Sequence, residues 1–597
     1  TELRKNVIFL KCGAKIIGIL ELCNIFAEKF KIMKKFIGIS SILAGAAICC
    51  GIFFGFKNSD ERSFQIVKSL DVFNAVFKEL DMFYVDTIDP KEVIEYGINA
   101  MLAKTDPYTE YYPEEDNTLK EMTTGKFGGI GSVIRYCTSR KLVAIIEPSE
   151  GNPAAEAGLR AGDLILEING KDMSQGNRTP NEMTSYVSDN LRGEPGTLCV
   201  IKVDRPTSDS TYVPMEFKVT RGTIRTNPIP YYGMLNDSIG YIYISTFSME
   251  GCSKEVKKAF MELKREGATS LVLDLRSNGG GLLNEAVEVV NFFVPKGKEI
   301  VTTKGKLKQA AYSYRTKNEP LDLEIPLAVL VDGNTASAAE ILSGSLQDLD
   351  RAVIVGNRTY GKGLVQTLRN LPYNSTMKIT TSKYYIPSGR CIQAIDYSKR
   401  NADGSIARTP DSLTHVFYTS AGREVRDGGG IRPDIEIVEE KVPNILFYLV
   451  NEDMVFDYAT LYRIKHPQIA SIEEFELTDA DYEEFKAMLK KRNFTYDRQS
   501  EAVLKNLKEL AEFEGYMENA SEEFAALEKK LRHNLDLELD RFAKQIKPLL
   551  KEEIVKRYYF ERGAVQEALK DNPNLKKAIE VLQDTTLYNK VFEVAKK

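Results

Sequence analysis

The chain has 597 residues, which at about 150 residues per domain predicts roughly four domains. Its 80 Lys and Arg nearly balance its 85 Asp and Glu, so no overall positive charge indicates a nucleic-acid partner. Only three histidines are present and no HExxH sequence occurs, which excludes that class of metalloprotease; the eight cysteines lack metal-ligand spacing, and no metal or cofactor is predicted.

The first predicted element is an apolar stretch at residues 37–56, which contains no charged side chain. As a helix, its 20 residues would span about 30 Å, the thickness of a bilayer core. Lys34 and Lys35 precede it, so the positive-inside rule keeps residues 1–36 in the cytoplasm and exports the rest of the chain. We therefore expect an inner-membrane anchor, with the rest of the chain in the periplasm of the cell envelope. A cleaved signal peptide and a buried core helix are the alternatives.

The rest of the chain changes character three times. Apolar residues at helical spacing, such as Phe64, Val67 and Leu70, first predict a helical region. Short β-rich runs between Gly, Pro and Asn turns follow, and then strands alternate with helices, as in an α/β layered domain. The last part is mostly charged helix, which we interpret as a solvated appendage in preference to a specific binding surface. The predicted boundaries are 1–36 for a cytoplasmic extension, 37–56 for the anchor or signal, 57–123 for a helical N-terminal domain, 124–222 for the β-rich domain, 223–440 for the α/β core and 441–597 for a helical C-terminal domain.

The β-rich domain contains two informative segments. Gly128, Gly129, Ile130 and Gly131 precede a predicted strand, and a Gly-rich turn there points successive backbone N–H groups into one concavity that suits a carboxylate. Such a turn alone is most often only a turn. The second segment, 157–170, predicts a short helix, a tight turn and a hydrophobic strand. Together the two resemble a PDZ domain, which implies that the four loop residues bind the C-terminal carboxylate of a peptide added as a strand.

Ser337 is the candidate nucleophile of the α/β core. It follows a predicted strand at 327–331 and begins a predicted helix, where free N–H groups and the helix dipole could stabilise an oxyanion. A serine in such a place, taken alone, is more often a helix N-cap. A further segment, 273–281, is a strand that ends in a Gly-rich turn. Backbone N–H groups there can approach a reacting carbonyl, or simply join strand to helix.

A serine nucleophile needs a base, and Lys362 is the best candidate. No histidine precedes His415, which lies in an extended polar segment far along the chain. For Lys362 to accept a proton near neutral pH, its pKa must fall from about 10.4 to about 7–8, which burial can supply. Gln366 could hold the amine by a hydrogen bond. The segment 356–363 superficially matches a phosphate-binding GxxxxGK[ST] loop, but a glycine replaces the final Ser or Thr, which argues against an NTPase.

These segments together resemble the carboxyl-terminal processing proteases, also called tail-specific proteases. The resemblance implies a multidomain α/β fold with a crotonase- or ClpP-like serine protease core. It implies Ser337 as nucleophile, Lys362 as base and Gln366 as the partner that orients the base. It also implies an oxyanion hole formed by the amides of Ala338 and one glycine of the 279–281 turn, of which Gly281 is favoured. The motifs that carry it, in order, lie at 106–112, 128–131, 274–281, 335–340, 346–348, 361–366, 385–390 and 429–434.

The resemblance implies a serine endopeptidase that captures the C-terminal tails of exported proteins through its PDZ domain and cleaves them through an acyl-enzyme. Its partners would be proteins with exposed C-termini and the membrane, with self-association or an adaptor left open. Glu340 and Asp348 are interpreted as structural, since a Ser–Lys dyad needs no carboxylate. The alternative is a non-cleaving PDZ scaffold or chaperone of the cell envelope, against which the complete set of Ser337, Lys362 and Gln366 argues.

Overall fold

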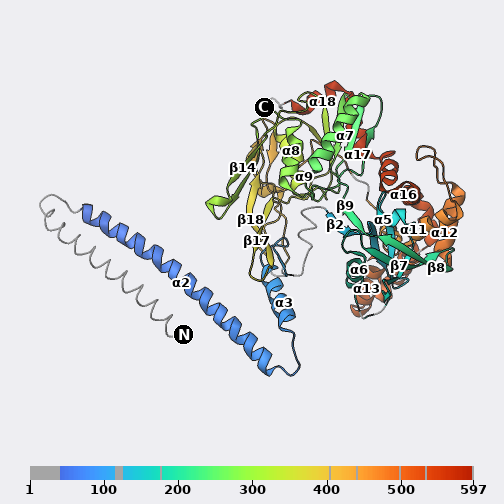
Figure 1. Cartoon of the computed structure of the whole chain (residues 1–597), viewed down its shortest axis with the longest axis horizontal. Coiled ribbons are helices and arrows are strands. Elements are labelled where there is room, and N and C mark those ends of the chain that lie inside the picture. The colour runs from blue at the N-terminus through green and yellow to red at the C-terminus, as the bar shows by residue number, and fades with distance from the viewer. Residues whose placement is uncertain are drawn as a thin grey trace. The chain divides into compact units, whose positions relative to one another are not determined.

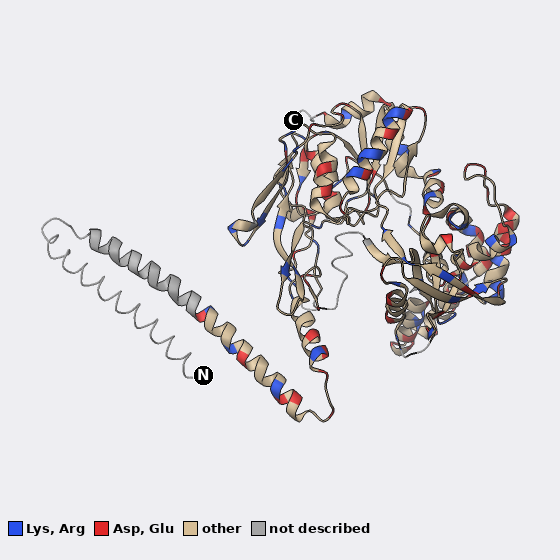
Figure 2. Ribbon diagram, in the orientation of Figure 1, with Lys and Arg blue, Asp and Glu red and all other residues tan. Residues whose placement is uncertain are grey.

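The computed structural model describes the backbone of residues 40–114, 126–174, 176, 178–401, 405–438, 441–496, 499–531 and 534–593, with nearly all side chains from residue 61 onward in these ranges. The chain forms two compact units, Thr1–Ala100 and Met101–Lys597 (Figure 1). Within the described part, Lys and Arg are interspersed with Asp and Glu (Figure 2). This mixture agrees with the near balance of charges in the sequence.

The part of the first unit that the structure describes is mostly helical. Helix α2 runs over Ser40–Phe83 and α3 over Pro90–Leu102, which reaches into the second unit. The apolar side chains Phe64 and Val67, which predicted a helix here, are more than half exposed. None of the helices that the structure describes is long and apolar enough to cross a bilayer. The side chains of the expected span at 37–56 lie outside the described residues, so the anchor stays a prediction.

The β-rich domain folds around one hydrophobic core. Its antiparallel sheet has the order β3-β4-β5-β7-β8, with β6 beside β5, and β2 pairs separately with β9. Helix α6 has Pro180 as its first residue and begins with a capping box between Thr179 and Glu182, which satisfies amides of its first turn. The bounds are β2 Lys126–Gly129, β3 Ser132–Cys137, β4 Leu142–Pro148, α5 Pro153–Glu156, β5 Leu164–Ile168, β6 Lys171–Asp172, α6 Pro180–Leu191, β7 Leu198–Pro206, β8 Tyr212–Thr220 and β9 Gly222–Arg225.

A six-stranded sheet of order β10-β11-β12-β15-β16-β21 is the centre of the α/β core. Every neighbour pair is parallel except β10 with β11. On one face, Leu271, Leu273 and Val329 pack against α7, α8 and α9, so this face is covered by helices as parallel sheets require. The bounds are β10 Tyr231–Met234, β11 Ile239–Tyr243, α7 Cys252–Glu266, β12 Ser270–Asp274, α8 Leu283–Asn291, β15 Leu327–Val331, α9 Ala338–Asp348, β16 Val353–Gly356 and β21 Ile435–Glu436.

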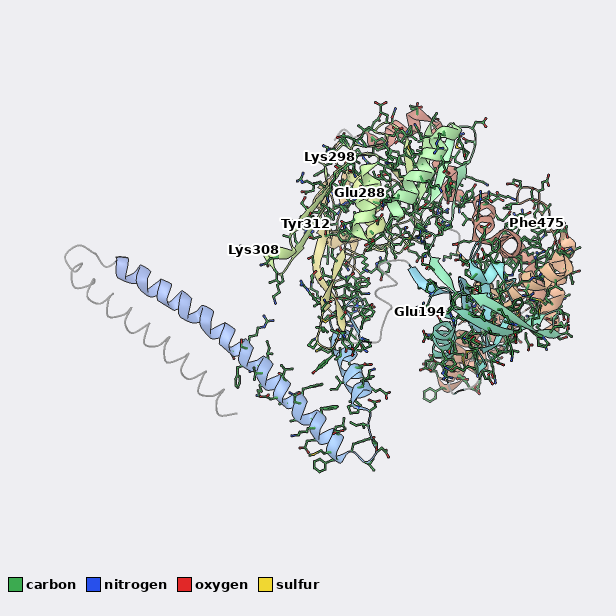
Figure 3. The ribbon with its side chains drawn as sticks, in the orientation of Figure 1. Glu194, Glu288, Lys298, Lys308, Tyr312 and Phe475 are labelled. Atoms are coloured by element: carbon green, nitrogen blue, oxygen red, sulfur yellow. The ribbon has the colours of Figure 1, made fainter. Side chains whose placement is uncertain are left out.

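The C-terminal helices cover the opposite face of the same sheet. Leu575 and Val581 of α17 are buried against Val272 and Leu330. Helices α10, α11, α12, α15 and α16 enclose a core of their own, in which Phe475 is buried (Figure 3). The expectation of a solvated appendage was therefore wrong, because the second face of the sheet needs a cover that helical spacing alone cannot assign. The bounds are α10 Asn444–Asn451, α11 Met454–Lys465, α12 Asp479–Lys491, α13 Gln499–Phe513, α14 Met517–Leu531, α15 Leu535–Arg541, α16 Ala543–Leu569, α17 Pro573–Gln583 and α18 Thr585–Phe592.

A second sheet lies in the core around β18, which pairs antiparallel with β1, β13 and β17. Strand β1 belongs to the segment 106–112, so this early motif is brought to β18, near the end of the protease region. Strand β14, which carries Tyr312, pairs with β13 at the edge of the sheet (Figure 3). The remaining bounds are β1 Glu110–Tyr112, β13 Glu299–Gly305, η1 Lys308–Ala310, β14 Tyr312–Arg315, β17 Leu364–Asn370, β18 Thr376–Tyr385, η2 Asp411–Leu413, β19 Val416–Tyr418 and β20 Glu424–Arg426.

Candidate active site

Ser337 lies at the junction between strand β15 and helix α9. Its φ of 57° is in the left-handed region that a non-glycine residue seldom adopts, so the backbone here is strained. Neighbouring residues hold the turn: Thr335 Oγ1 donates to the Leu275 carbonyl at 2.9 Å, and the Ala336 amide donates to the Asn278 carbonyl at 2.9 Å. The serine is half-buried at the start of a helix, at the positive end of the helix dipole, which suits a nucleophile beside an anion site.

Lys362 follows strand β16 and is brought to the same end of the sheet. The Ser337 amide donates to Glu340 at 2.8 Å and the Lys362 amide donates to the same carboxylate oxygen at 2.9 Å, so the two backbones are adjacent. Burial lowers the pKa of the Lys362 amine, and the nearby Lys378 lowers it further. The direction is the one that a lysine base requires.

The Lys362 amine rests against an aromatic ring. Its Nζ lies 3.9 Å from the centroid of the Tyr108 ring, and among the described residues no hydrogen bond joins it to the Ser337 hydroxyl. Tyr108 comes from the segment that enters β1, and its own hydroxyl lies 3.2 Å from that of Tyr397. Gln366, expected to orient the amine, instead donates from Nε2 to Thr380 Oγ1 at 3.1 Å. In this conformation the Lys362 amine contacts the Tyr108 ring instead of Gln366.

The Gly-rich turn after β12 packs directly against the nucleophile. A Cβ on Gly280 would lie 2.7 Å from the Ser337 Cβ, so the backbone can approach this closely only with glycine. The Gly280 amide is used by the Asn278 side chain at 2.8 Å. Within the described residues, neither the Gly281 amide nor the Ala338 amide donates a hydrogen bond. The two amides that the sequence assigned to an oxyanion hole are therefore available.

The segment expected to form a four-residue Gly-rich loop is only partly a loop: Gly128 and Gly129 end strand β2 and pair with β9, and Ile130 and Gly131 connect β2 to β3. The Gly131 carbonyl accepts from the Ser149 amide at 3.0 Å and the Ile130 carbonyl accepts from Ala154 at 2.8 Å, so the loop is fixed by the start of α5. Gly128 is packed against the backbone of Gly193, where a Cβ would clash. Strand β3 is an edge of its sheet and α6 contacts it. A peptide added to β3 would therefore lie beside α6, with its end at residues 128–131.

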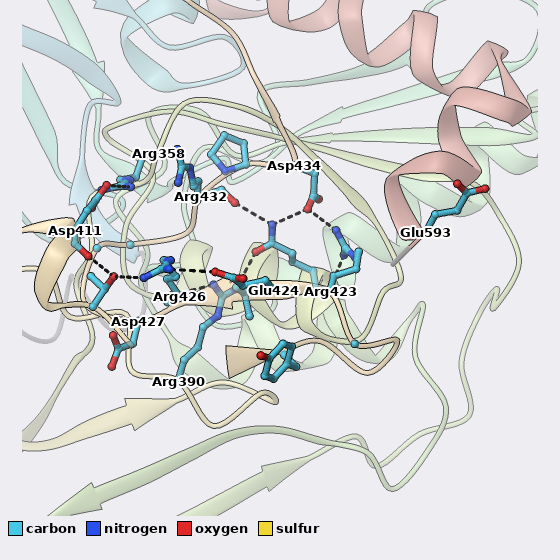
Figure 4. Close-up of a pocket in the computed structure, with 18 residues that line it drawn as sticks. Arg358, Arg390, Asp411, Arg423, Glu424, Arg426, Asp427, Arg432, Asp434 and Glu593 are labelled. Atoms are coloured by element: carbon cyan, nitrogen blue, oxygen red, sulfur yellow. Dashed lines mark hydrogen bonds and ion pairs between the residues drawn. The ribbon is translucent and has the colours of Figure 1, made fainter. Parts of the chain in front are cut away.

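A cavity of about 450 Å³ lies at the opposite end of α9, away from Ser337 (Figure 4). It is rich in arginine, but most of its guanidinium groups are paired with carboxylates: for example, Arg423 pairs with Asp434 at 2.6 Å and Arg358 with Asp411 at 2.7 Å. The charges of its wall thus balance one another, and the cavity is unlike an anion site. No group of three or more His, Cys, Asp or Glu that could hold a metal occurs in the described part of the chain.

Comparison with known proteins identifies the family. Three family models match: peptidase family S41 at residues 238–399, a PDZ domain at 145–205, and the C-terminal helical domain of a probable PDZ-protease at 445–582. A carboxy-terminal-processing protease of Bartonella bacilliformis is 35% identical over 345 residues, which cover 57% of this chain and 75% of the relative. The chain belongs to the carboxy-terminal-processing protease family.

A further family member, from Picosynechococcus sp., is 37% identical over 298 residues, which are 49% of this chain and 68% of that protein. A solved photosystem II D1 C-terminal processing protease is 26% identical and covers 62% of this chain and 88% of its own, with a TM-score of 0.33. The resemblance seen in the motifs is confirmed, and the chain is a serine-type peptidase with a PDZ domain and a helical C-terminal domain. The C-terminal part, outside the motifs of this carboxy-terminal-processing protease, thus has a family model of its own.

Sequence reasoning missed two residues beside the candidate dyad, Tyr108 and Tyr384. Tyr108 lies within the 106–112 motif, but nothing in that motif names Lys362 as its neighbour. Tyr384 directly precedes the motif at 385–390 and was not singled out. Both contacts depend on the pairing of strands far apart in the chain, which the sequence does not display.

Proposed function

We propose that this carboxy-terminal-processing protease cleaves exported proteins with Ser337 as nucleophile and Lys362 as general base. The observation that carries the proposal is the adjacency of the two backbones at one carboxylate, together with a buried lysine whose pKa is lowered. The neutral amine takes the proton of the Ser337 hydroxyl as the oxygen attacks the scissile carbonyl. The amides of Gly281 and Ala338 donate to the oxyanion. Lys362 then gives the proton to the leaving amine, and water hydrolyses the acyl-enzyme.

Catalysis in this proposal requires the Lys362 amine to leave the Tyr108 ring. A rotamer change of a long, unbranched side chain can supply this motion. Gln366 is proposed to form a hydrogen bond with the Lys362 amine afterwards, in exchange for its bond to Thr380. The resting contact with Tyr108 then corresponds to a state without substrate.

Substrates are proposed to enter by their C-termini. The edge strand β3, the helix α6 and the loop 128–131 support the capture of an extended peptide and its carboxylate in the PDZ domain. The 37–56 stretch supports an inner-membrane anchor, with the protease in the periplasm. The exposed apolar side chains of α2 support self-association as a further interaction.

The test uses the full chain and an unstructured protein that ends in small apolar residues. Fragments are followed by mass spectrometry beside Ser337→Ala and Lys362→Ala. We expect cleavage by the parent and by neither variant. Binding of the tail without cleavage by all three proteins would favour the non-cleaving scaffold and overturn the proposed dyad. Cleavage by Lys362→Ala at the parental rate would exclude Lys362 as the base.

A further inference from the structure

Glu340 is a fully buried carboxylate that accepts four hydrogen bonds and forms no ion pair among the described residues. One oxygen accepts from the amides of Ser337 and Lys362, and the other accepts from the Gly361 amide at 2.8 Å and from the Thr359 hydroxyl. The donors come from both segments of the candidate dyad: the start of α9 and the loop after β16. A carboxylate without water must have such partners, because an unpaired buried charge costs several kcal/mol.

Tyr384 joins the same two segments from the other side of the backbone. Its hydroxyl lies 2.6 Å from the Lys362 carbonyl oxygen and 3.1 Å from the Ser337 carbonyl oxygen. The side chain is only 1% exposed, and burial holds the pKa of its phenol well above the ordinary value, so it remains a donor. It extends from β18, the strand that also receives β1.

The amides of Ser337 and Lys362 thus converge on Glu340, and their carbonyls converge on Tyr384. We infer that Glu340 and Tyr384 form a two-sided clamp that sets the separation of nucleophile and base. Neither side chain donates to or accepts from the Ser337 hydroxyl or the Lys362 amine, so they act through the backbone and are positioning residues. The inference rests on the proposed function. It extends the interpretation of Glu340 as merely structural by giving it a measurable effect on the reaction.

The clamp is expected to affect turnover more than substrate binding. Displacement of a reacting group by about 1 Å costs on the order of 10²-fold in rate. Glu340→Gln keeps the shape but turns an NH₂ group toward N–H donors, and should lower kcat about 10²-fold. Tyr384→Phe keeps the ring in the core and removes only the hydroxyl, and should lower kcat about 10-fold. In both variants KM should stay within about threefold of the parent, because the proposed peptide site is in another domain.

Two matched controls separate the clamp from a general loss of stability. Tyr482 is also a buried tyrosine whose hydroxyl donates to a backbone carbonyl, that of Leu539 at 2.7 Å, but it lies in the helical domain. Asp322 also accepts from two backbone amides, those of Glu324 and Ile325, in the loop before β15, at the other end of this strand from Ser337. Tyr482→Phe and Asp322→Asn should keep kcat within about twofold.

A second measurement does not depend on activity. Hydrogen exchange of the full chain should show faster exchange of the Gly361 and Lys362 amides in Glu340→Gln, and unchanged exchange in Asp322→Asn. The inference is overturned if these amides keep their protection, or if kcat stays within twofold while the parent cleaves and Ser337→Ala does not. If the parent fails to cleave, the proposed function is contradicted instead. The exchange result would still decide whether Glu340 fixes the loop that carries Gly361 and Lys362.

Discussion

Helix α9 buries a carboxylate at each end, and the two have different partners. At the C-terminal end, Asp348 pairs with the buried guanidinium of Arg390 at 2.8 Å and accepts from the Ser388 amide at 3.0 Å. At the N-terminal end, Glu340 receives only neutral donors, beside Ser337. Where no reaction is proposed, the helix is fixed by an ion pair. Where a proton is proposed to move, Glu340 forms no ion pair among the described residues, and the Lys362 amine is a positive group whose pKa burial lowers and Glu340 raises.

The largest effect is expected when Lys362, the cation near Glu340, is replaced by a side chain whose charge is permanent. Lys362→Arg retains a positive charge that cannot be released near neutral pH, so the variant lacks a base and kcat should fall about 10⁴-fold or more. Lys378→Arg is the matched control, because the pKa of Lys378 is raised by its bond to Glu110 and the residue is charged in either form. Steady-state cleavage rates measure both. A substantial rate in Lys362→Arg would show that the base is another group.

Removing the charge at the other end should affect stability. Asp348→Asn leaves Arg390 buried without its counter-ion, and should lower the free energy of unfolding of the core by about 3 kcal/mol. Urea unfolding of the full chain, with Lys399 exposed on the surface changed to Gln as control, measures the difference. A loss below about 1 kcal/mol would mean that the ion pair does not anchor this end.

The pH dependence of stability sharpens the comparison. Burial raises the pKa of Glu340 from 4.5 to about 7. Because the folded pKa lies above the unfolded one, the stabilisation is complete below about pH 4.5 and is lost as the pH rises to about 7, by up to about 3 kcal/mol. The unfolding free energy of the parent minus that of Glu340→Gln should therefore decline across this window. If this difference in unfolding free energy is constant with pH, the raised pKa of Glu340 is contradicted.

The smallest expected effect concerns the ring beside the lysine. Activity should rise with pH as Lys362 loses its proton, because only the neutral amine is a base. Tyr108→Ala admits water to the Lys362 amine. Relief of burial raises the pKa of Lys362 more than loss of the cation–π contact lowers it. The rising limb of the pH–activity profile should therefore move to higher pH by less than about one unit. Tyr108→Phe keeps the ring face and should leave the limb in place. Equal shifts in both variants would exclude the ring as the cause.

Local signals in the sequence predicted most of what lies near the candidate nucleophile. The apolar run before Ser337 predicted β15, the change of period after it predicted α9, and the glycines at 279–281 predicted a close turn. The amides of Gly281 and Ala338, which the resemblance assigns to an oxyanion hole, donate no hydrogen bond among the described residues, and their role stays a prediction. These features depend on neighbours in the chain, which is why spacing and composition sufficed.

The partners of Lys362 could not be predicted in the same way. The sequence offered Gln366 because it is close in the chain, whereas the structure places Tyr108 on the amine through the pairing of β1 with β18. The C-terminal helices were likewise recognised as helices, but not as the cover of the central sheet. Both depend on contacts between segments that are remote in sequence.

The sequence by itself determined the order of domains, the family resemblance and the identity of the candidate dyad, because each is written in short motifs and hydrophobic periods. Only the tertiary structure decided which groups surround that dyad. Burial exists only once strands and helices have packed, and it changes the pKa of Lys362. The convergence of distant backbone amides on Glu340 and of carbonyls on Tyr384 also requires that packing, and it sets the position of Ser337.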